Sequence, residues 1–314
     1  MLTRRHIRVK VMQGVYALQH SNDSNLKEQE LFLQKSMANM FNLYTSLLAL
    51  LLELKAMAEN QLEVNSKKYL KEQSTTFSNP TKFSENSVLK FLAEDQFLKE
   101  TLESKKLKIW YLNPEYVKII FKEITSSQVY KAYMETNTIS FEADKEFIIK
   151  VFKTIIAPNE KLYEFLEDDQ LTWVDDLPIV NTYLVKQLKK LTDYSTESLL
   201  PELKIDKEDL DFGLNLLKKT ALKSEEFISQ YMDKTANWDK ERIADLDAIL
   251  LQMAICEFMY FPSIPVRVSL NEYLEIAKEY SSPKSSIFIN GILDSVSNQL
   301  KETGKLKKSG RGLL

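Results

Sequence analysis

The chain is poor in the residues that most catalytic sites require. It has one cysteine, Cys256, and two histidines, His6 and His20, among 314 residues. A single cysteine excludes an internal disulfide bond and a zinc site built from thiolates. Two histidines leave little material for a catalytic triad or a histidine-rich metal site. We therefore expect neither a metal site nor a cofactor.

Glycine and proline are also scarce. No glycine occurs between Gly14 and Gly213, and no proline precedes Pro80. Tight hairpins and the loops of α/β folds need these residues, so their absence predicts long helices and an all-α protein. The six glycines also do not permit a P-loop or a Rossmann dinucleotide-binding motif, which argues against a nucleotide-dependent enzyme.

Long apolar runs are missing as well. The longest, Leu47 to Leu52, is too short to cross a bilayer. No apolar segment follows the basic N-terminus, which therefore lacks the pattern of a signal peptide. With only one cysteine, these features predict a cytoplasmic protein without membrane contact.

The charges are unevenly distributed along the chain, whose net charge is only −3. Residues 1–22 carry four cations and no acid, and residues 301–314 carry five cations and one acid. Two basic ends on an acidic body suggest a localised site for an anion. The glycine, serine and lysine content of 301–314 predicts a flexible basic tail.

Residues 4–19 are predicted to form the first helix, with an apolar stripe at Ile7, Val11, Val15 and Leu18. Three arginines crowd its first turn, where cations oppose the helix dipole. A helix that accepts this cost is suited to an anionic partner, and arginine clusters on helices commonly hold a phosphate backbone.

The next part of the chain predicts a long antiparallel helical hairpin. Residues 26–73 have near-continuous helical character, residues 75–86 are a loop by composition, and residues 87–135 form a second set of helices broken near Asn113-Pro114. The methionines and aromatic residues of these helices are assigned to a bundle core.

Two later stretches, 143–205 and 206–260, are similar to each other. In each, an Asp-Lys-Glu triplet opens a predicted helix and a tryptophan follows at its far end: Asp144 and Trp173 in the first, Asp206 and Trp238 in the second. The similarity is either a degenerate internal repeat or a chance likeness between amphipathic helices.

The C-terminal third contains three predicted helices. Residues 239–260 are apolar on most sides, which places this helix in a bundle centre and makes Cys256 a buried apolar residue. Pro262 to Pro265 then break the chain. Ser269 to Glu272 fit a capping box at the start of the second helix.

The last helix begins with a pattern suited to an anion. Lys284, Ser285 and Ser286 lie in its first turn, where free backbone N–H groups favour phosphate. Phe288 lies one turn further on and either faces outward to stack on a base or is an ordinary core residue. Gly291 is predicted to permit a close helix crossing.

These residues resemble a known family. Residues 242–296 resemble the C-terminal half of the NusB transcription antitermination factors, and the start of the chain resembles the arginine-rich first helix of that family. The similarity lies in Glu257-Phe258, Ile264-Pro265, Val268, Asn271-Glu272, Ala277-Lys278 and Phe288 to Asp294, and in Arg4-Arg5-His6-x-Arg8 with Gln13 and Tyr16.

The resemblance implies a domain organisation. It covers about residues 1–22 and 206–300, and members of the family are usually about half as long as this chain. Residues 23–205 are therefore predicted to be a helical insertion, which either only stabilises or shields the bundle or has a role of its own. The predicted fold is an all-α, NusB-like helical bundle with a long antiparallel hairpin or bundle inserted after the first helix.

The resemblance also implies a function. Family members are non-catalytic adaptors that bind the boxA sequence of nascent, single-stranded RNA together with NusE, a ribosomal protein. They act on the transcription elongation complex and support ribosomal RNA synthesis. The expected role here is the same.

The family pattern assigns roles to individual residues. Arg4, Arg5 and Arg8 would hold phosphates, with His6 where the family often has arginine; Lys284, where the family often has aspartate, would strengthen phosphate binding beside Ser285 and Ser286; Phe288 would stack on a base; and Tyr16, Glu241 and Asp247 would face the ribosomal protein. We predict that the first turns of the first and last helices converge into one cationic cradle.

Two other functions are compatible with the composition. The chain could be a protein-binding helical scaffold without RNA binding, with the insertion as its working surface. It could also be an enzyme, because NusB-like domains occur fused to RNA methyltransferases. Those enzymes need a glycine-rich cofactor loop on a parallel sheet, and nothing in the sequence supplies one.

Overall fold

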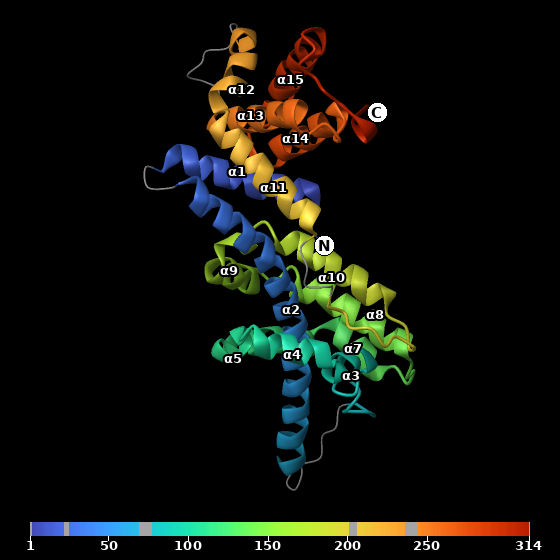
Figure 1. Cartoon of the computed structure of the whole chain (residues 1–314). Coiled ribbons are helices and arrows are strands. Elements are labelled where there is room, and N and C mark those ends of the chain that lie inside the picture. The colour runs from blue at the N-terminus through green and yellow to red at the C-terminus, as the bar shows by residue number, and fades with distance from the viewer. Residues whose placement is uncertain (1, 22–24, 69–76, 201–205, 236–243, 314) are drawn as a thin grey trace. The chain divides into compact units, whose positions relative to one another are not determined.

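The computed structural model describes residues 2–21, 25–68, 77–200, 206–235 and 244–313, and it contains helices and no strand in those ranges (Figure 1). The prediction of an all-α protein is confirmed. The chain forms two compact units. The middle unit is Asn39–Leu203, and the terminal unit is Leu2–Ala38 together with Lys204–Leu314.

The middle unit is built around the second part of one long helix. Its elements are α2 (Leu26–Lys68), α3 (Ser87–Glu94), α4 (Gln96–Ser104), α5 (Ile109–Leu112), α6 (Pro114–Ser126), α7 (Gln128–Glu135), α8 (Phe141–Val151), α9 (Glu160–Asp169) and α10 (Leu177–Lys190). The predicted long helix over 26–73 is confirmed as far as residue 68, and residues 69–73 lie outside the described ranges.

The expected second arm of a long hairpin is wrong, because residues 87–135 form five short helices that make a bundle. Polar side chains restart the helix at several points: Asn86 accepts hydrogen bonds from the Val88 and Leu89 amides, and Ser127 accepts one from the Tyr130 amide. Pro114 begins α6 after the predicted break. Each of these residues starts a new helix, and Ser127 also ends the one before it.

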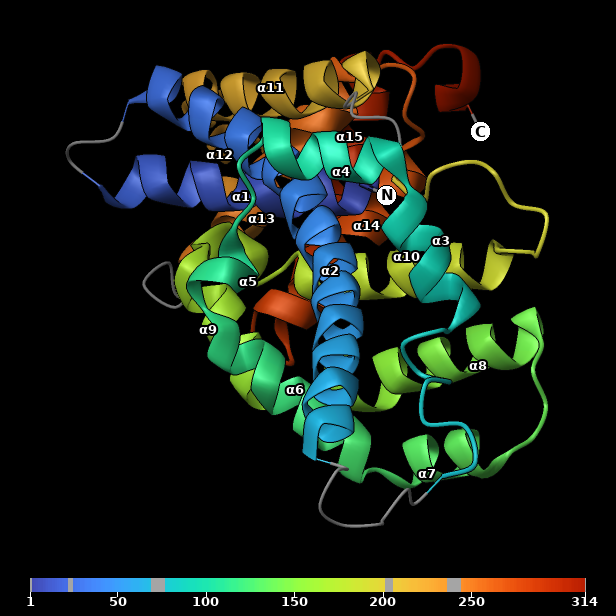
Figure 2. The ribbon, with the colours of Figure 1, turned by 90° about the horizontal axis from the view of Figure 1, so that it is seen from below.

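The short helices surround α2 (Figure 2). The Trp110 indole donates a 2.6 Å hydrogen bond to the Ser46 carbonyl oxygen, and the Trp173 indole donates one of 3.1 Å to the Asn39 carbonyl oxygen. By length and hydropathy α2 could cross a membrane, but 78% of its most apolar stretch is buried within the protein. Its apolar side chains therefore have partners in the fold.

The first of the two similar stretches differs in register from the second. Asp206 is the N-cap of its helix, whereas α8 begins at Phe141 with Ser140 as its N-cap, so Asp144 does not open that helix. The Asp144 carboxylate is buried and accepts a 2.6 Å hydrogen bond from the Tyr133 hydroxyl. Trp238 lies outside the described residues. The internal repeat stays a prediction.

The terminal unit packs its helices around α13, as predicted. Its elements are α1 (Arg4–His20), the start of α2, α11 (Lys207–Leu222), α12 (Ser224–Tyr231), α13 (Asp245–Tyr260), α14 (Val266–Tyr280) and α15 (Ser285–Glu302). Residues 249–258 of α13 are buried on every side. Cys256 is fully buried, and burial raises the pKa of its thiol to about 12. Such a thiol is not an activated nucleophile.

The predicted capping box at Ser269 is wrong. Helix α14 begins three residues earlier, at Val266, directly after Pro265. Ser269 therefore lies within the helix and does not cap it. Its hydroxyl donates a 2.7 Å hydrogen bond to the Glu257 carboxylate in the core.

Two glycines, neither of them Gly291, allow the close crossing of α1 and α11. A β-carbon at Gly213 would lie 2.9 Å from the Ile7 side chain, and one at Gly14 would lie 3.3 Å from the Leu217 side chain. At Gly291 a β-carbon would meet nothing within 4 Å, so the prediction of a crossing there is wrong.

This contrast makes a testable prediction. Gly213→Ala is expected to lower the free energy of unfolding, because overpacking costs about 1–3 kcal/mol and outweighs the gain in helix propensity. Gly291→Ala, the matched control in an open position, is expected to raise it by about 0.5–1 kcal/mol. Urea denaturation followed by circular dichroism measures both. Equal effects of the two substitutions would contradict the tight crossing.

The chain end is docked on the terminal unit, which corrects the prediction of a flexible tail. Gly304, with φ of +66°, ends α15 and turns the chain back. The Lys308 ammonium donates hydrogen bonds of 3.1 Å to the carbonyl oxygens of Glu257 and Phe261, and the Ser309 amide donates one of 3.0 Å to the Pro262 carbonyl oxygen. The carbonyl oxygens of Glu257 and Phe261 already accept the Phe261 and Ile264 amides, and each accepts a second hydrogen bond from Lys308, a pairing that composition alone does not reveal.

Candidate nucleic-acid interface

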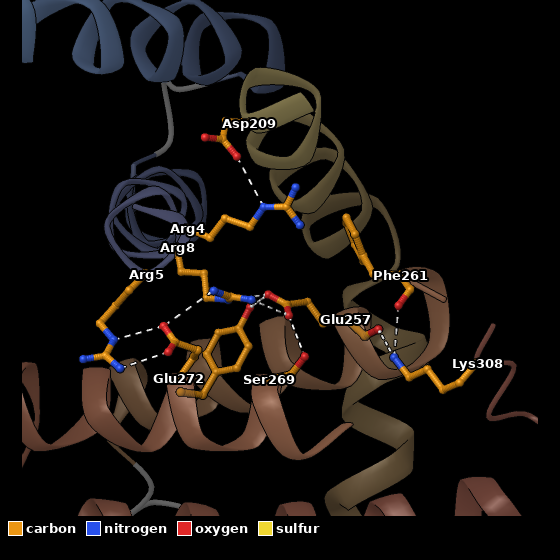
Figure 3. A network of polar contacts seen from close by, with 10 residues as sticks. Arg4, Arg5, Arg8, Asp209, Glu257, Phe261, Ser269, Glu272 and Lys308 are labelled. Carbon is orange, nitrogen blue, oxygen red and sulfur yellow. Dashed lines mark hydrogen bonds and ion pairs between the residues drawn. The ribbon is translucent and has the colours of Figure 1, made fainter. Parts of the chain in front are cut away.

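The exposed arginines of α1 line a groove. Thr3 caps the helix by accepting a hydrogen bond from the His6 amide, which places the arginines in the first turn. Arg4 contacts the Asp209 and Glu208 carboxylates of α11, each at 3.3 Å. The Nε and one terminal nitrogen of Arg5 donate to Glu272 of α14, at 3.0 and 2.9 Å (Figure 3).

This arginine groove has a volume of about 630 Å³. Its walls come from the start of α1, the α13–α14 turn and the first turns of α14. They are formed by Thr3, Arg4, Arg5, Arg8, Ser263, Ile264, Pro265, Val268 and Glu272.

Arg8 does not fit its predicted role as a phosphate ligand. Its side chain is only 2% exposed, and it donates hydrogen bonds of 2.6 and 2.9 Å to the two carboxylate oxygens of Glu257 (Figure 3). The same carboxylate accepts hydrogen bonds from Ser269 and from the Tyr273 hydroxyl, each at 2.7 Å. Arg8 is therefore a structural cation. His6 is buried as well, so its predicted contact with RNA is also wrong for this structure.

The ion pairs of Arg5 and Arg8 differ in strength. For Arg5, the hydrogen bond with Glu272 is the main cause of a raised pKa. For Arg8, burial opposes the charge, but the charge of Glu257 and its hydrogen bonds outweigh burial and raise the pKa. Because the Arg5 side chain is 43% exposed, its pair contributes only about 0–1 kcal/mol. Exchanging Glu272 for a phosphate at Arg5 therefore costs little, and Glu272 keeps its 3.7 Å ion pair with Arg8.

The start of α15 is only partly open. Lys284 is exposed and Ser286 is half-buried. Ser285 is buried, and its hydroxyl is hydrogen-bonded to the hydroxyls of Ser281 and Ser282, at 2.9 and 2.8 Å. The Ser285 amide donates a 2.9 Å hydrogen bond to the Ser282 carbonyl oxygen, so it is not one of the free backbone N–H groups predicted to bind phosphate.

Phe288 lines a second groove, of about 550 Å³. Its ring is half-buried against the core, so it is neither sealed inside nor fully exposed. Ile287 beside it is 74% exposed. This phenylalanine groove is formed by Lys234, Lys284, Ile287, Phe288, Gly291, Ile292 and Ser295. Gly291 is exposed and contributes only backbone to this groove.

The two grooves have no lining residue in common, so the predicted single cradle is not formed. Arg8, one turn after the exposed arginines, meets α13 at Glu257, near the C-terminal end of that helix. The segment before α15 meets α13 at its other end, where the Ser281 hydroxyl donates a 2.6 Å hydrogen bond to Asp247. These two residues of α13 are about 15 Å apart along the helix. One ligand must be extended to contact both grooves.

The three residues predicted to face a protein partner have different surroundings. Tyr16 is 44% exposed, and its ring stacks on His20 at 4.1 Å between centroids. Asp247 is buried and held by Ser281, so it does not offer a charge to a partner. Glu241 lies outside the described residues. Of the three, Tyr16 alone is seen on the surface.

His20 is expected to titrate above its ordinary range. Its ring nitrogens lie 3.0 Å from the Tyr16 carbonyl oxygen and 3.0 Å from the Asp245 carboxylate. Both partners accept hydrogen bonds, so the doubly protonated ring can donate to both, and the pKa of His20 is raised, mainly by the Tyr16 carbonyl and then by Asp245. The stabilisation is present below pH 6.5 and is lost as the pH rises through the raised pKa. An NMR titration of the wild type against Asp245→Asn measures this, and equal pKa values would contradict it.

Sequence reasoning missed Lys234 and Glu257. Lys234 belongs to a short 3-10 turn, Met232–Thr235, and reaches the phenylalanine groove only through tertiary packing. Glu257 was placed in a helix buried on all sides. A carboxylate at such a position must be paired, and that rule was the available signal for a buried cation.

Comparison with known proteins identifies the family. The NusB family model matches residues 177–298, which begin within the segment predicted as an insertion and do not include α1. The curated NusB transcription antitermination protein of Chloroherpeton thalassium is 34% identical over 142 residues, covering 45% of this chain and 67% of that protein. No solved structure gives a significant match.

Two further relatives belong to the same family. The curated NusB transcription antitermination protein of Salinibacter ruber is 42% identical over 110 residues, which cover 35% of this chain and 68% of that protein. That of Natranaerobius thermophilus is 46% identical over 76 residues, which cover 24% and 55%. With a NusB model match and an all-helical fold, the chain belongs to the NusB family of transcription antitermination proteins.

Proposed function

We propose that this protein is a cytoplasmic, non-catalytic adaptor that binds boxA-like single-stranded RNA together with the NusE ribosomal protein in the transcription elongation complex. The phenylalanine groove is the observation that carries the proposal. It combines an aromatic ring with the ammonium groups of Lys234 and Lys284. Single-stranded nucleic acids bind to such combinations of stacking platforms and cations.

The arginine groove supports the same proposal. Arg4 and Arg5 are both more than two-fifths exposed, and their carboxylate partners are on the surface. RNA that extends from one groove to the other would place its backbone on the arginines and a base on Phe288. Tyr16 and the His20 ring stacked on it are the proposed contact with NusE.

Non-catalytic action agrees with the chemistry of the described residues. No group of three or more His, Cys, Asp or Glu side chains among them is arranged to hold a metal ion. The one thiol is buried with a raised pKa. A methyl-transfer assay with a labelled donor tests this part of the proposal, and a positive result would overturn it.

Filter binding of boxA-like RNA over a salt series tests the adaptor. Arg5→Ala is expected to weaken binding and to make the slope of log K against log salt shallower by roughly 0.7, because the variant binds one phosphate of a single strand fewer. Lys118→Ala, an exposed lysine of the middle unit, is the control and is expected to change neither. Binding that is indifferent to salt and to Arg5 would support a protein-binding scaffold instead.

A further inference from the structure

The docked chain end is anchored at a defined place. The Lys308 ammonium donates hydrogen bonds to two carbonyl oxygens at the end of α13 (Figure 3), and Leu306 packs against the core. Gly312 is buried, and a β-carbon there would overlap the carbonyl oxygen of Pro262. The φ of Gly312 lies outside the left-handed region, so the requirement for glycine comes from this close approach. A glycine at position 312 therefore permits the chain end to dock against Pro262.

The anchor point borders the arginine groove. The tail contacts Pro262 through the Ser309 amide and through Gly312. The next three residues, Ser263 to Pro265, form one wall of the groove that holds Arg4 and Arg5. Tail and groove thus share the α13–α14 turn.

We propose that the docked tail is an additional binding surface for the RNA backbone, with Lys307 as its phosphate ligand. This inference rests on the proposed RNA binding and extends it beyond the two grooves. Lys307 is exposed, and its neighbour Lys308 fixes the segment that carries it. A cation on an anchored segment loses less conformational freedom on binding than one on a free tail.

The charge of the tail favours RNA binding over shielding. A segment that blocks a cationic groove would carry acids to pair with its arginines. Residues 303–313 contain four cations and no acid. Arg4 and Arg5 already have carboxylate partners on α11 and α14. The tail therefore adds positive charge beside the groove and attracts a polyanion.

Two variants distinguish the effect of tail docking from the effect of the tail's charge. Gly312→Ala keeps every charge but forces the tail away from Pro262. Lys307→Ala removes one charge and leaves the anchoring hydrogen bonds of Lys308 and Ser309 in place. Trypsin cleavage in the tail, measured without RNA, reports docking directly. We expect faster cleavage after Lys308 in Gly312→Ala, and an unchanged rate there in Lys307→Ala.

RNA binding over a salt series then tests the proposal. Both variants are expected to weaken binding of boxA-like RNA and to make the salt slope shallower, by roughly 0.7 for each phosphate that the protein no longer binds. Unchanged or tighter binding by Gly312→Ala, with the wild type binding RNA and Phe288→Ala impaired, would overturn the tail surface alone. Absence of RNA binding by the wild type would overturn the proposed function itself.

Discussion

Glu257→Leu is expected to destabilise the terminal unit by about 3–5 kcal/mol, because it removes the closest partner of the buried Arg8 and leaves only the Glu272 carboxylate, at 3.7 Å. Arg8 is 2% exposed and Glu257 is not exposed at all. The substitution also removes the acceptor of the Ser269 and Tyr273 hydroxyls. Urea denaturation followed by circular dichroism is the measurement, and Arg8→Met is expected to have a similar effect from the other side of the pair.

The double variant Arg8→Met with Glu257→Leu is the control. Apolar replacement of a whole buried ion pair is often neutral, so the double variant is expected to recover much of the stability. Single-variant effects that simply add would mean that Arg8 and Glu257 do not stabilise each other. Glu208→Ala, which removes an exposed partner of Arg4, is expected to change stability by less than about 1 kcal/mol.

The Arg8–Glu257 ion pair also positions the exposed arginines of the arginine groove. Arg8 lies one turn after Arg4 and Arg5, and its hydrogen bonds to α13 fix the first turns of α1 against the core. Phe212 of α11 lies under the guanidinium groups of both Arg4 and Arg8, at 5.3 and 5.1 Å. The buried Arg8 thus holds the exposed Arg4 and Arg5 at a defined position.

The sequence alone predicted those features that depend only on the spacing of apolar residues along one helix. The apolar stripe predicted α1 within one residue of its observed end, and the apolar surface of residues 249–258 predicted that α13 is central. Both are properties of one helix alone. Arg4 and Arg5 line one groove and Lys284 and Phe288 the other, and their contacts with RNA stay a prediction.

Pairings between distant residues could not be predicted in this way. Arg8 and Glu257 are separated by 249 positions, and only the packing of α1 on α13 brings them together. Ser269 had the local pattern of a cap, but its hydroxyl is used by that carboxylate instead. The tail has a composition typical of flexible segments, yet it docks through Lys308, which donates to two carbonyl oxygens at the end of α13, and through Leu306, which packs against the core. The role of residues 23–205 as an insertion stays a prediction.

Phe288→Ala is expected to weaken the binding of boxA-like RNA by about 5- to 150-fold, which corresponds to about 1–3 kcal/mol for one stacked base. The ring is half-buried in its groove, which Ile287, Lys234 and Lys284 also line. The salt slope is expected to stay unchanged, because stacking involves no phosphate. This distinguishes Phe288 from Arg5 and Lys284, whose replacement by alanine is expected to reduce the slope.

Phe97→Ala is the matched control for this substitution. Phe97 is an exposed phenylalanine of the middle unit, 39% exposed, and its replacement removes the same side chain from a surface that lines neither groove. Fluorescence anisotropy with labelled RNA measures both variants, and urea denaturation shows whether either has become less stable. If Phe288→Ala binds RNA as tightly as Phe97→Ala, then Phe288 is only a core residue at the edge of a groove, and the stacking half of the interface is wrong.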